Sequence, residues 1–266
     1  MWIIQSNFLD TNQITPLVEA LNEFNVPFKD VSVIPFSDEF VTPLELDHKN
    51  VIPYGSTKLC KIAEMQGWTG LFFNRDTFNV SRWNIERDYD MLNNDAEIMT
   101  VRESMSSFND ADYPDEEPWF IRPLEDLKQF NGTVTTAKEI RRWMSSVDSG
   151  NFSFDENTLV AISSVKDIKM EWRYFVVDRK IVTGSSYRRM GQRLTSRELD
   201  PEVLAEAQSF ADGWLPHETC VMDMALTDRG LKIIEFNCLN ASGFYYHDIK
   251  AFAREVTKYF VDKYPA

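Results

Sequence analysis

The segment CVMDMALTDRGLKIIEFN, residues 220–237, constrains the fold of this chain more than any other stretch. Two apolar runs flank an Asp-Arg-Gly turn, and a turn closed by a left-handed glycine is typical of a hairpin with a three-residue loop. Such a loop pairs Thr227 with Leu231 and, counted back, predicts Asp223 directly opposite Glu235. A two-residue loop is the alternative, and it turns Asp223 to the other face of the hairpin.

A third polar side chain joins this predicted pair. Residues i and i+2 of a strand share a face, so Asn237 lies on the face of Glu235. Like charges directly opposite each other are destabilising, so two carboxylates and an amide oxygen together favour a bound cation. Mg²⁺ prefers such oxygen ligands and leaves its other positions to phosphates and water. The pattern therefore predicts Asp223, Glu235 and Asn237 as magnesium ligands. The same letters EFN at residues 23–25 fall in a helical pattern and predict no site.

Basic residues are concentrated in one part of an acidic chain. The 266 residues carry a formal net charge of −14, which argues against a general nucleic-acid or anionic-membrane binder. Residues 166–197 nevertheless hold nine basic residues against three acidic ones. A solvated β-ribbon is the plain explanation of this basic segment, and an anion-binding surface is the other.

The strand pattern within the basic segment favours the second explanation. EWRYFVVDRKIVTG predicts a hairpin with a two-residue turn at Asp178-Arg179, which sets Arg173 opposite Gly184. A glycine at that position leaves room for a ligand. Arg122, at a strand end, and Lys128 add two further cations. Cations together with a magnesium site provide what a nucleoside triphosphate needs to bind.

Other chemistries find no support in the sequence. It has no Walker, dinucleotide-binding, zinc-protease or nucleophile-elbow motif, and its three histidines lie far apart. Its three cysteines have no C-x-x-C spacing and are expected to be reduced thiols in a cytoplasmic protein. We expect no signal peptide and no membrane partner, because no apolar run approaches the roughly 18 residues of a membrane helix.

The order of elements predicts an α+β or α/β protein with two parts. Strands at residues 1–6 and 31–36 flank a helix at 15–25, and a second helix follows Ser56. This small α/β unit ends near residue 90. An acidic loop at 106–118 precedes a longer region of strands and helices that reaches the end of the chain.

Three motifs in order carry a resemblance to a known superfamily. FIRP followed by K and F-x-G, then EWRYFVVDRKIV, then VMDMA followed by IIEFN, resemble the ATP-grasp fold over roughly residues 95–260. The sequence is most similar to a clade of small ATP-grasp proteins of phages and bacteria. The segment MEWRYFVVDRKIVTGSSYR also resembles the eukaryotic ATP-grasp chaperone that assembles translation initiation factor 2.

The resemblance implies an α+β architecture in which two subdomains at residues 91–266 sandwich ATP, preceded by a small α/β domain at residues 1–90. It implies that Arg122 and Lys128 are phosphate-binding cations. The backbone of Ser164 and Val165 would bind adenine.

The resemblance also implies a chemistry. Arg173 and Arg188 would contact the γ-phosphate or the acceptor carboxylate, and Asp223, Glu235 and Asn237 would hold Mg²⁺. The expected function is an ATP- and Mg²⁺-dependent carboxylate–amine ligase that acts through an acyl phosphate. Its partners would be a carboxylate substrate and an amine acceptor. The alternative is an ATP-binding assembly factor that binds a protein partner without making a bond.

Overall fold

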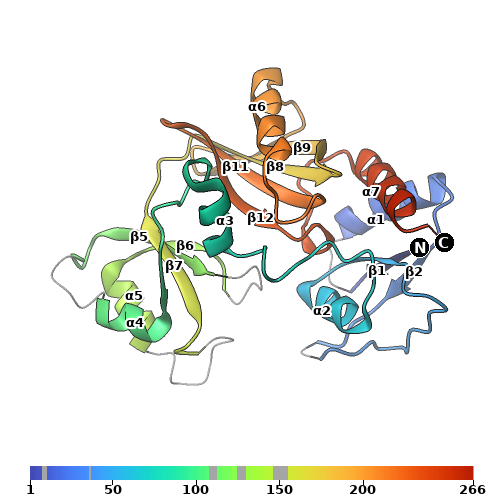
Figure 1. Ribbon diagram of the computed structural model, residues 1–266, viewed down its shortest axis with the longest axis horizontal. Coiled ribbons are helices and arrows are strands. Elements are labelled where there is room, and N and C mark those ends of the chain that lie inside the picture. The colour runs from blue at the N-terminus through green and yellow to red at the C-terminus, as the bar shows by residue number, and fades with distance from the viewer. Residues whose placement is uncertain (8–10, 36, 108–112, 125–129, 146–154, 266) are drawn as a thin grey trace. The chain divides into compact units, whose positions relative to one another are not determined.

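The computed structural model describes residues 1–7, 11–35, 37–107, 113–124, 130–145 and 155–265. The chain forms two compact units, Met1–Asn74 with Ile168–Ala266 and Arg75–Asp167, each of which combines helices with a β-sheet (Figure 1). The predicted α+β class is thus confirmed, while the predicted domain boundary near residue 90 stays a prediction. Within the described residues, no helix has the length and apolar character needed to span a membrane.

The first unit begins with a three-stranded parallel sheet in the order β2-β1-β3. Its elements are β1 (Trp2–Gln5), α1 (Thr11–Glu23), β2 (Phe28–Val31), β3 (Ile52–Tyr54) and α2 (Thr57–Gln66). The predicted strand–helix–strand start is confirmed, but α1 begins before Thr15 and contains Pro16. The strand expected at 31–36 is also wrong, because β2 ends at Val31.

Helix α2 has the ends that its sequence predicts. The Ser56 side chain accepts a hydrogen bond from the Leu59 backbone amide at 3.3 Å, which satisfies one of the free donors of the first turn. Gly67 ends the helix with φ at 67°, a left-handed conformation that suits glycine.

The C-terminal part of this unit is a five-stranded antiparallel sheet in the order β10-β9-β8-β11-β12. Its elements are β8 (Met170–Val177), β9 (Lys180–Arg189), β10 (Gln192–Ser196), α6 (Pro201–Asp212), β11 (Cys220–Thr227), β12 (Gly230–Asn237), the 3-10 helix η3 (Leu239–Ala241) and α7 (Ile249–Lys263). Neither β10 nor η3 was expected from the sequence.

One hydrophobic core joins both sheets of the first unit. Trp2 of β1, Phe175 of β8 and Phe252 of α7 are fully buried in the same cluster. Asn240 of η3 ties the sheets together through polar contacts, because its side-chain amide donates to the backbone carbonyls of Pro53 and Gly70 at 2.7 and 2.8 Å. The 3-10 helix η3, which directly follows the predicted metal ligands of β12, is therefore held rigidly.

The second unit is built on a four-stranded antiparallel sheet in the order β4-β7-β5-β6. Its elements are α3 (Val80–Arg87), the 3-10 helix η1 (Asp88–Asp90), β4 (Glu97–Thr100), α4 (Val101–Ser107), β5 (Pro118–Pro123), β6 (Thr133–Thr136), α5 (Ala137–Ser145) and β7 (Leu159–Ser164). Ile121 of β5 packs into a core with Ile140 of α5 and Val160 of β7. Since neighbours in a strand face opposite sides, Arg122 lies on the face of the sheet turned away from this core.

Candidate functional site

The β11–β12 hairpin pairs Asp223 directly with Glu235, as the sequence predicts. The route to this register differs from the predicted one. Gly230 adopts a left-handed φ of 88°, but the turn pairs Thr227 with Gly230 rather than with Leu231. That shorter loop alone would turn Asp223 to the other face. A β-bulge that makes Ile234 the extra residue of β12 restores the pairing of the two carboxylates.

Asn237 joins the two carboxylates on the same face of the sheet. Its Nδ2 donates to Glu235 Oε1 at 3.1 Å and lies 3.4 Å from Asp223 Oδ2. The amide thus links two like charges that would otherwise only repel each other. The predicted constellation of Asp223, Glu235 and Asn237 is brought together in three dimensions, and its metal-binding role stays a prediction.

The chain itself supplies a cation for this cluster. Arg173 of β8 is paired directly with Asp223, and its Nε and Nη2 donate to both carboxylate oxygens at 2.8 and 2.7 Å. The same guanidinium donates to the Gly243 carbonyl at 3.2 Å and lies 5.0 Å from the centroid of the Tyr245 ring. The opposed carboxylates therefore need an external cation less than their sequence pattern predicts, because Arg173 already neutralises part of their charge.

Burial governs the protonation of this ion pair. Burial raises the pKa of Asp223, and the nearby carboxylates of Glu235 and Glu171 add to this, while Arg173 acts in the opposite direction. Burial lowers the pKa of Arg173, but the charge of Asp223 and its hydrogen bonds more than compensate, so the net direction is upward. The carboxylate therefore sits where an additional cation would be strongly stabilising.

A second ion pair lies beside the first in the same sheet. Glu171 of β8 is buried and pairs directly with Arg188 of β9, whose Nη1 lies 3.2 Å from Glu171 Oε1. Arg188, which was predicted to contact the γ-phosphate or the acceptor, has a half-exposed side chain. It is thus anchored at the rim of the cluster with its head group open to a ligand.

Two tyrosines that the sequence pattern did not predict complete the site. The rings of Tyr187 and Tyr245 stack with centroids 4.6 Å apart. Burial raises the pKa of Tyr187, and the carboxylates of Asp223 and Glu171 raise it further. Tyr187 is the extra residue of a β-bulge in β9, and such bulges re-aim side chains. No residue pattern signals that bulge; only the position of Glu171 on the face of Arg173 pointed toward this part of the site.

The predicted role of Gly184 is wrong. A β-bulge that makes Val182 the extra residue shifts the register of β9, so Gly184 lies opposite Tyr174 and Arg173 lies opposite Ser185. A Cβ added at Gly184 would come within 2.6 Å of the Tyr174 ring. The glycine makes room for an aromatic side chain of the sheet and not for a ligand beside Arg173.

The second unit carries the residues predicted to hold the nucleotide. Arg122 is buried, its Nε donates to the Pro123 carbonyl at 3.3 Å, and its guanidinium lies 5.3 Å from the centroid of the Trp83 ring. A cation–π contact of this kind orients the guanidinium plane. Lys128 lies outside the described residues.

Ser164 and Val165 mark the end of strand β7. The Ser164 hydroxyl donates to Asp95 Oδ2 at 2.6 Å, and Lys166 forms an ion pair with the same carboxylate oxygen at 2.6 Å. The Val165 side chain is 42% exposed. The side chain of Ser164 is therefore occupied, and any adenine contact would come from backbone groups, as the resemblance implies.

The donor set of β11 and β12 fits magnesium in its chemistry. Mg²⁺ is commonly bound by one or two carboxylates and completes its shell with phosphate oxygens and water. Among the described residues, no group of three or more histidine, cysteine or acidic side chains is placed to hold a metal alone. Asp223, Glu235 and the amide oxygen of Asn237 thus suit a metal that arrives with a nucleotide, not a permanent structural ion.

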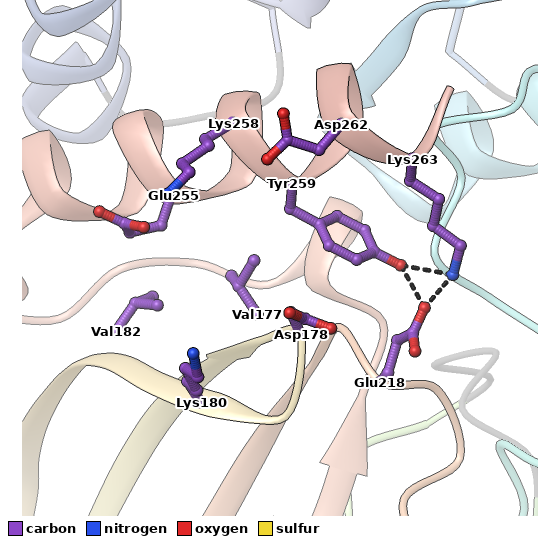
Figure 2. Close-up of a pocket in the computed structure, with 10 residues that line it drawn as sticks. All are labelled: Val177, Asp178, Lys180, Val182, Glu218, Glu255, Lys258, Tyr259, Asp262 and Lys263. Atoms are coloured by element: carbon purple, nitrogen blue, oxygen red, sulfur yellow. Dashed lines mark hydrogen bonds and ion pairs between the residues drawn. The ribbon is translucent and has the colours of Figure 1, made fainter. Parts of the chain in front are cut away.

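A separate pocket of about 390 Å³ lies between α7 and the β8–β9 hairpin of the first unit (Figure 2). Tyr259 of α7 donates to Glu218 Oε1 at 2.6 Å, and Lys263 contacts both groups. Four acidic and three basic side chains line the pocket. None of the predicted site residues does, so it is distinct from the Asp223 cluster.

Comparison with known proteins gives the class of the chain. The sequence model of an ATP-grasp domain, the second family of its clade, matches residues 100–255. The chain belongs to this ATP-grasp family. No curated protein matches it in sequence.

Solved structures show the same fold at low identity. D-cycloserine synthetase DcsG is similar over 98% of this chain and 100% of its own, with a TM-score of 0.58 and 12% identity. The RimK domain ATP-grasp protein from Sphaerobacter thermophilus is similar over 98% of each chain, with a TM-score of 0.60 and 12% identity. D-alanine–D-alanine ligase from Bacillus anthracis is similar over 98% of this chain and 96% of its own, with a TM-score of 0.55 and 12% identity. These likenesses establish the ATP-grasp fold.

Proposed function

We propose that this protein is an ATP- and Mg²⁺-dependent carboxylate–amine ligase that works through an acyl phosphate. The observation that carries the proposal is the clustering of Asp223, Glu235, Asn237 and Arg173 on one face of a buried sheet. Opposed carboxylates beside a guanidinium suit a site where a metal and cations share the charge of a triphosphate. Structural neighbours named ligase and synthetase support the same class of reaction.

In this proposal the residues of the β8–β12 sheet stabilise charge during two transfers. An oxygen of the substrate carboxylate attacks the γ-phosphorus of ATP, ADP leaves, and an amine then displaces phosphate from the acyl carbon. Bound Mg²⁺ would supply positive charge to the phosphoryl oxygens from Asp223, Glu235 and Asn237. Arg188, with its exposed head group, would bind the transferring phosphoryl group or the substrate carboxylate. Arg173 would hold Asp223 in position and share its charge.

Arg122, Lys128 and the backbone of Ser164 and Val165 would bind the nucleotide. The orientation of Arg122 over Trp83 and the exposure of Val165 support these roles. The identity of the carboxylate and of the amine, the phage or bacterial origin and the cytoplasmic location stay predictions.

One observation favours the alternative of an ATP-binding assembly factor. Arg173 engages both oxygens of Asp223, so one metal ligand is already neutralised without any metal. A site with such a pair could bind nucleotide to fix a shape for a protein partner without transferring a phosphoryl group.

Two measurements separate these functions. Mg·ATP should raise the melting temperature, because a ligand at a hundredfold excess over its dissociation constant stabilises the folded state by about 2.7 kcal/mol. For a ligase, ADP release with a panel of carboxylates should require an added amine, and Arg188→Ala should reduce it. Arg229→Ala, at the exposed β11–β12 turn, is the matched control and should leave it unchanged. A thermal shift without amine-dependent ADP release would favour the assembly factor, and no thermal shift would exclude both.

A further inference from the structure

The tip of the β9–β10 hairpin is a basic, exposed surface on a strongly acidic chain. Residues 188–197, which we call the β10 surface, contain four arginines and no acidic residue, although the chain has a net charge of −14. Two apolar side chains of this surface are exposed as well, Met190 at 67% and Leu194 at 51%. The proposed ligase function leaves most of this surface unexplained.

The charges of the β10 surface are not balanced within the chain. Arg193 of β10 is paired directly with Arg188 of β9, and like charges directly opposite are destabilising. Glu171 compensates Arg188 through the ion pair described above. Arg193 and Arg189 form no ion pair with any residue that the structure describes, and both are exposed. An anionic partner would remove the repulsion that the fold leaves in place.

The backbone of β10 is also open to a partner. β10 is the last strand of its sheet, so half of its backbone N–H and C=O groups point away from β9. A bulge between Arg193 and Ser196 is the only irregularity of the β9–β10 ladder, and it lies at one end of the strand. An extended segment can therefore pair with this edge by strand addition.

We propose that the β10 surface binds an extended acidic peptide segment of a partner protein, which adds a strand to the edge of the sheet. The arginines would meet acidic side chains, while Met190 and Leu194 would contact apolar ones. A peptide fits better than a nucleic acid because the acidic chain repels a polyanion beyond this small surface, and Glu198 and Asp200 directly follow it. This binding is independent of the proposed ligase chemistry.

The β10 surface is continuous with the candidate site. Arg193, Arg188 and Glu171 form one cross-strand row, and Arg173 lies two residues further along β8 on the same unit. A segment bound at β10 would lie two strands away from Arg173. This is where a partner or a polypeptide substrate would be brought close to the cluster.

The test uses the full-length protein without nucleotide and three fluorescein-labelled decapeptides in an anisotropy titration. One peptide alternates glutamate and valine, the second alternates lysine and valine, and the third is the first with alternate backbone nitrogens methylated. We expect saturable binding of the first that weakens with salt, no binding of the second, and binding of the third weaker by about tenfold, or 1.4 kcal/mol. Equal binding of the first and third peptides would overturn strand addition.

Two variants assign the binding to the surface. Arg193→Glu should weaken binding of the glutamate peptide by about tenfold, or 1.4 kcal/mol. Arg229→Glu, an equally exposed arginine at a different turn of the same sheet, should change it less than about twofold. Circular dichroism confirms that both variants are folded. Equal losses would mean a general electrostatic field and would overturn the proposal.

Three further outcomes also decide against it. Tighter binding of a single-stranded RNA decamer than of the glutamate peptide, lost in Arg193→Glu, would identify a nucleic-acid surface. Tighter, Arg193-dependent binding of phosphatidylserine vesicles would identify a membrane surface. No binding of any probe would mean that the arginines only protect an exposed sheet edge from self-association.

Discussion

Arg173 lies directly opposite Asp223 in the paired strands β8 and β11 and donates to both of its carboxylate oxygens, at 2.8 and 2.7 Å. The two side chains are 12% and 3% exposed. Bidentate pairs of this kind fix geometry as well as charge. Asp223 therefore has two tasks in our proposal, to hold Arg173 in the folded protein and to accept a metal when nucleotide binds.

Asp223→Asn should destabilise the protein strongly even without nucleotide or metal. The change leaves the buried Arg173 without its counter-ion, which typically costs about 3–5 kcal/mol. Urea denaturation in the presence of a chelator measures the free energy of unfolding. Asp30→Asn, an exposed aspartate of strand β2, is the matched control and should change it by less than about 0.5 kcal/mol. A loss no larger than that of the control would show that the pair contributes little.

Glu235→Gln should have the opposite profile. It removes one negative charge beside Asp223 and keeps an oxygen that can accept from Asn237, so the free energy of unfolding without metal should stay the same or rise slightly. With metal, the variant should lose most Mg·ATP-dependent ADP release, because a neutral amide binds Mg²⁺ far more weakly than a carboxylate. Both quantities are measured on the same preparation.

Glu23→Gln, in the other EFN triplet, is the control for this prediction. Glu23 forms an exposed ion pair with Lys250 at 2.5 Å, and such pairs contribute about 0–1 kcal/mol. Its ADP release should equal that of the wild type. Wild-type turnover in Glu235→Gln, or a loss of several kcal/mol of stability without metal, would contradict the metal site.

The sequence predicts what depends on local chemistry. The caps of α2 at Ser56 and Gly67 follow from hydrogen bonding and backbone freedom within a few residues, and both are confirmed. Strand β10 was missed because its sequence, QRLTS, holds a single apolar residue and it lies at an edge without a buried face. Short polar edge strands are defined by their neighbour, and that neighbour is not visible in their own residues.

The candidate site was predicted in part, and β-bulges account for the rest. Asp223 and Glu235 face each other because a bulge at Ile234 cancels the error in the predicted loop. Arg173 misses Gly184 because a bulge at Val182 shifts β9. A bulge is selected by packing of both strands against the rest of the fold, so alternation within one strand does not reveal it. The pairing of β8 with β11, which creates the ion pair, is likewise a contact of distant segments.

Gly184→Ala tests the corrected role of this glycine. The new methyl group would lie 2.6 Å from the Tyr174 ring, and overpacking of this kind costs about 1–3 kcal/mol of folding free energy. Mg·ATP binding by the folded variant should be unchanged. In the background of Tyr174→Leu the cost of Gly184→Ala should shrink, because the smaller side chain can give way. A variant with full stability but weakened ATP binding would restore the ligand-binding role.

Protonation of two buried histidines should destabilise the protein in mild acid. Burial lowers the pKa of His247 and of His217 from 6.5 to about 4. His247 Nδ1 accepts from the Tyr245 amide, and His217 Nδ1 accepts from the Thr219 amide, so each ring is held neutral. In the unfolded chain both rings take up a proton near pH 6.5, whereas in the folded protein they resist until about pH 4. Their contribution to stability is thus fully present above pH 6.5 and is lost as the pH falls toward 4, by about 3 kcal/mol for each ring. Urea denaturation at a series of pH values measures this slope, and His247→Gln and His217→Gln should each remove about half of it. A slope that persists in the double variant would assign the acid sensitivity to the carboxylates instead.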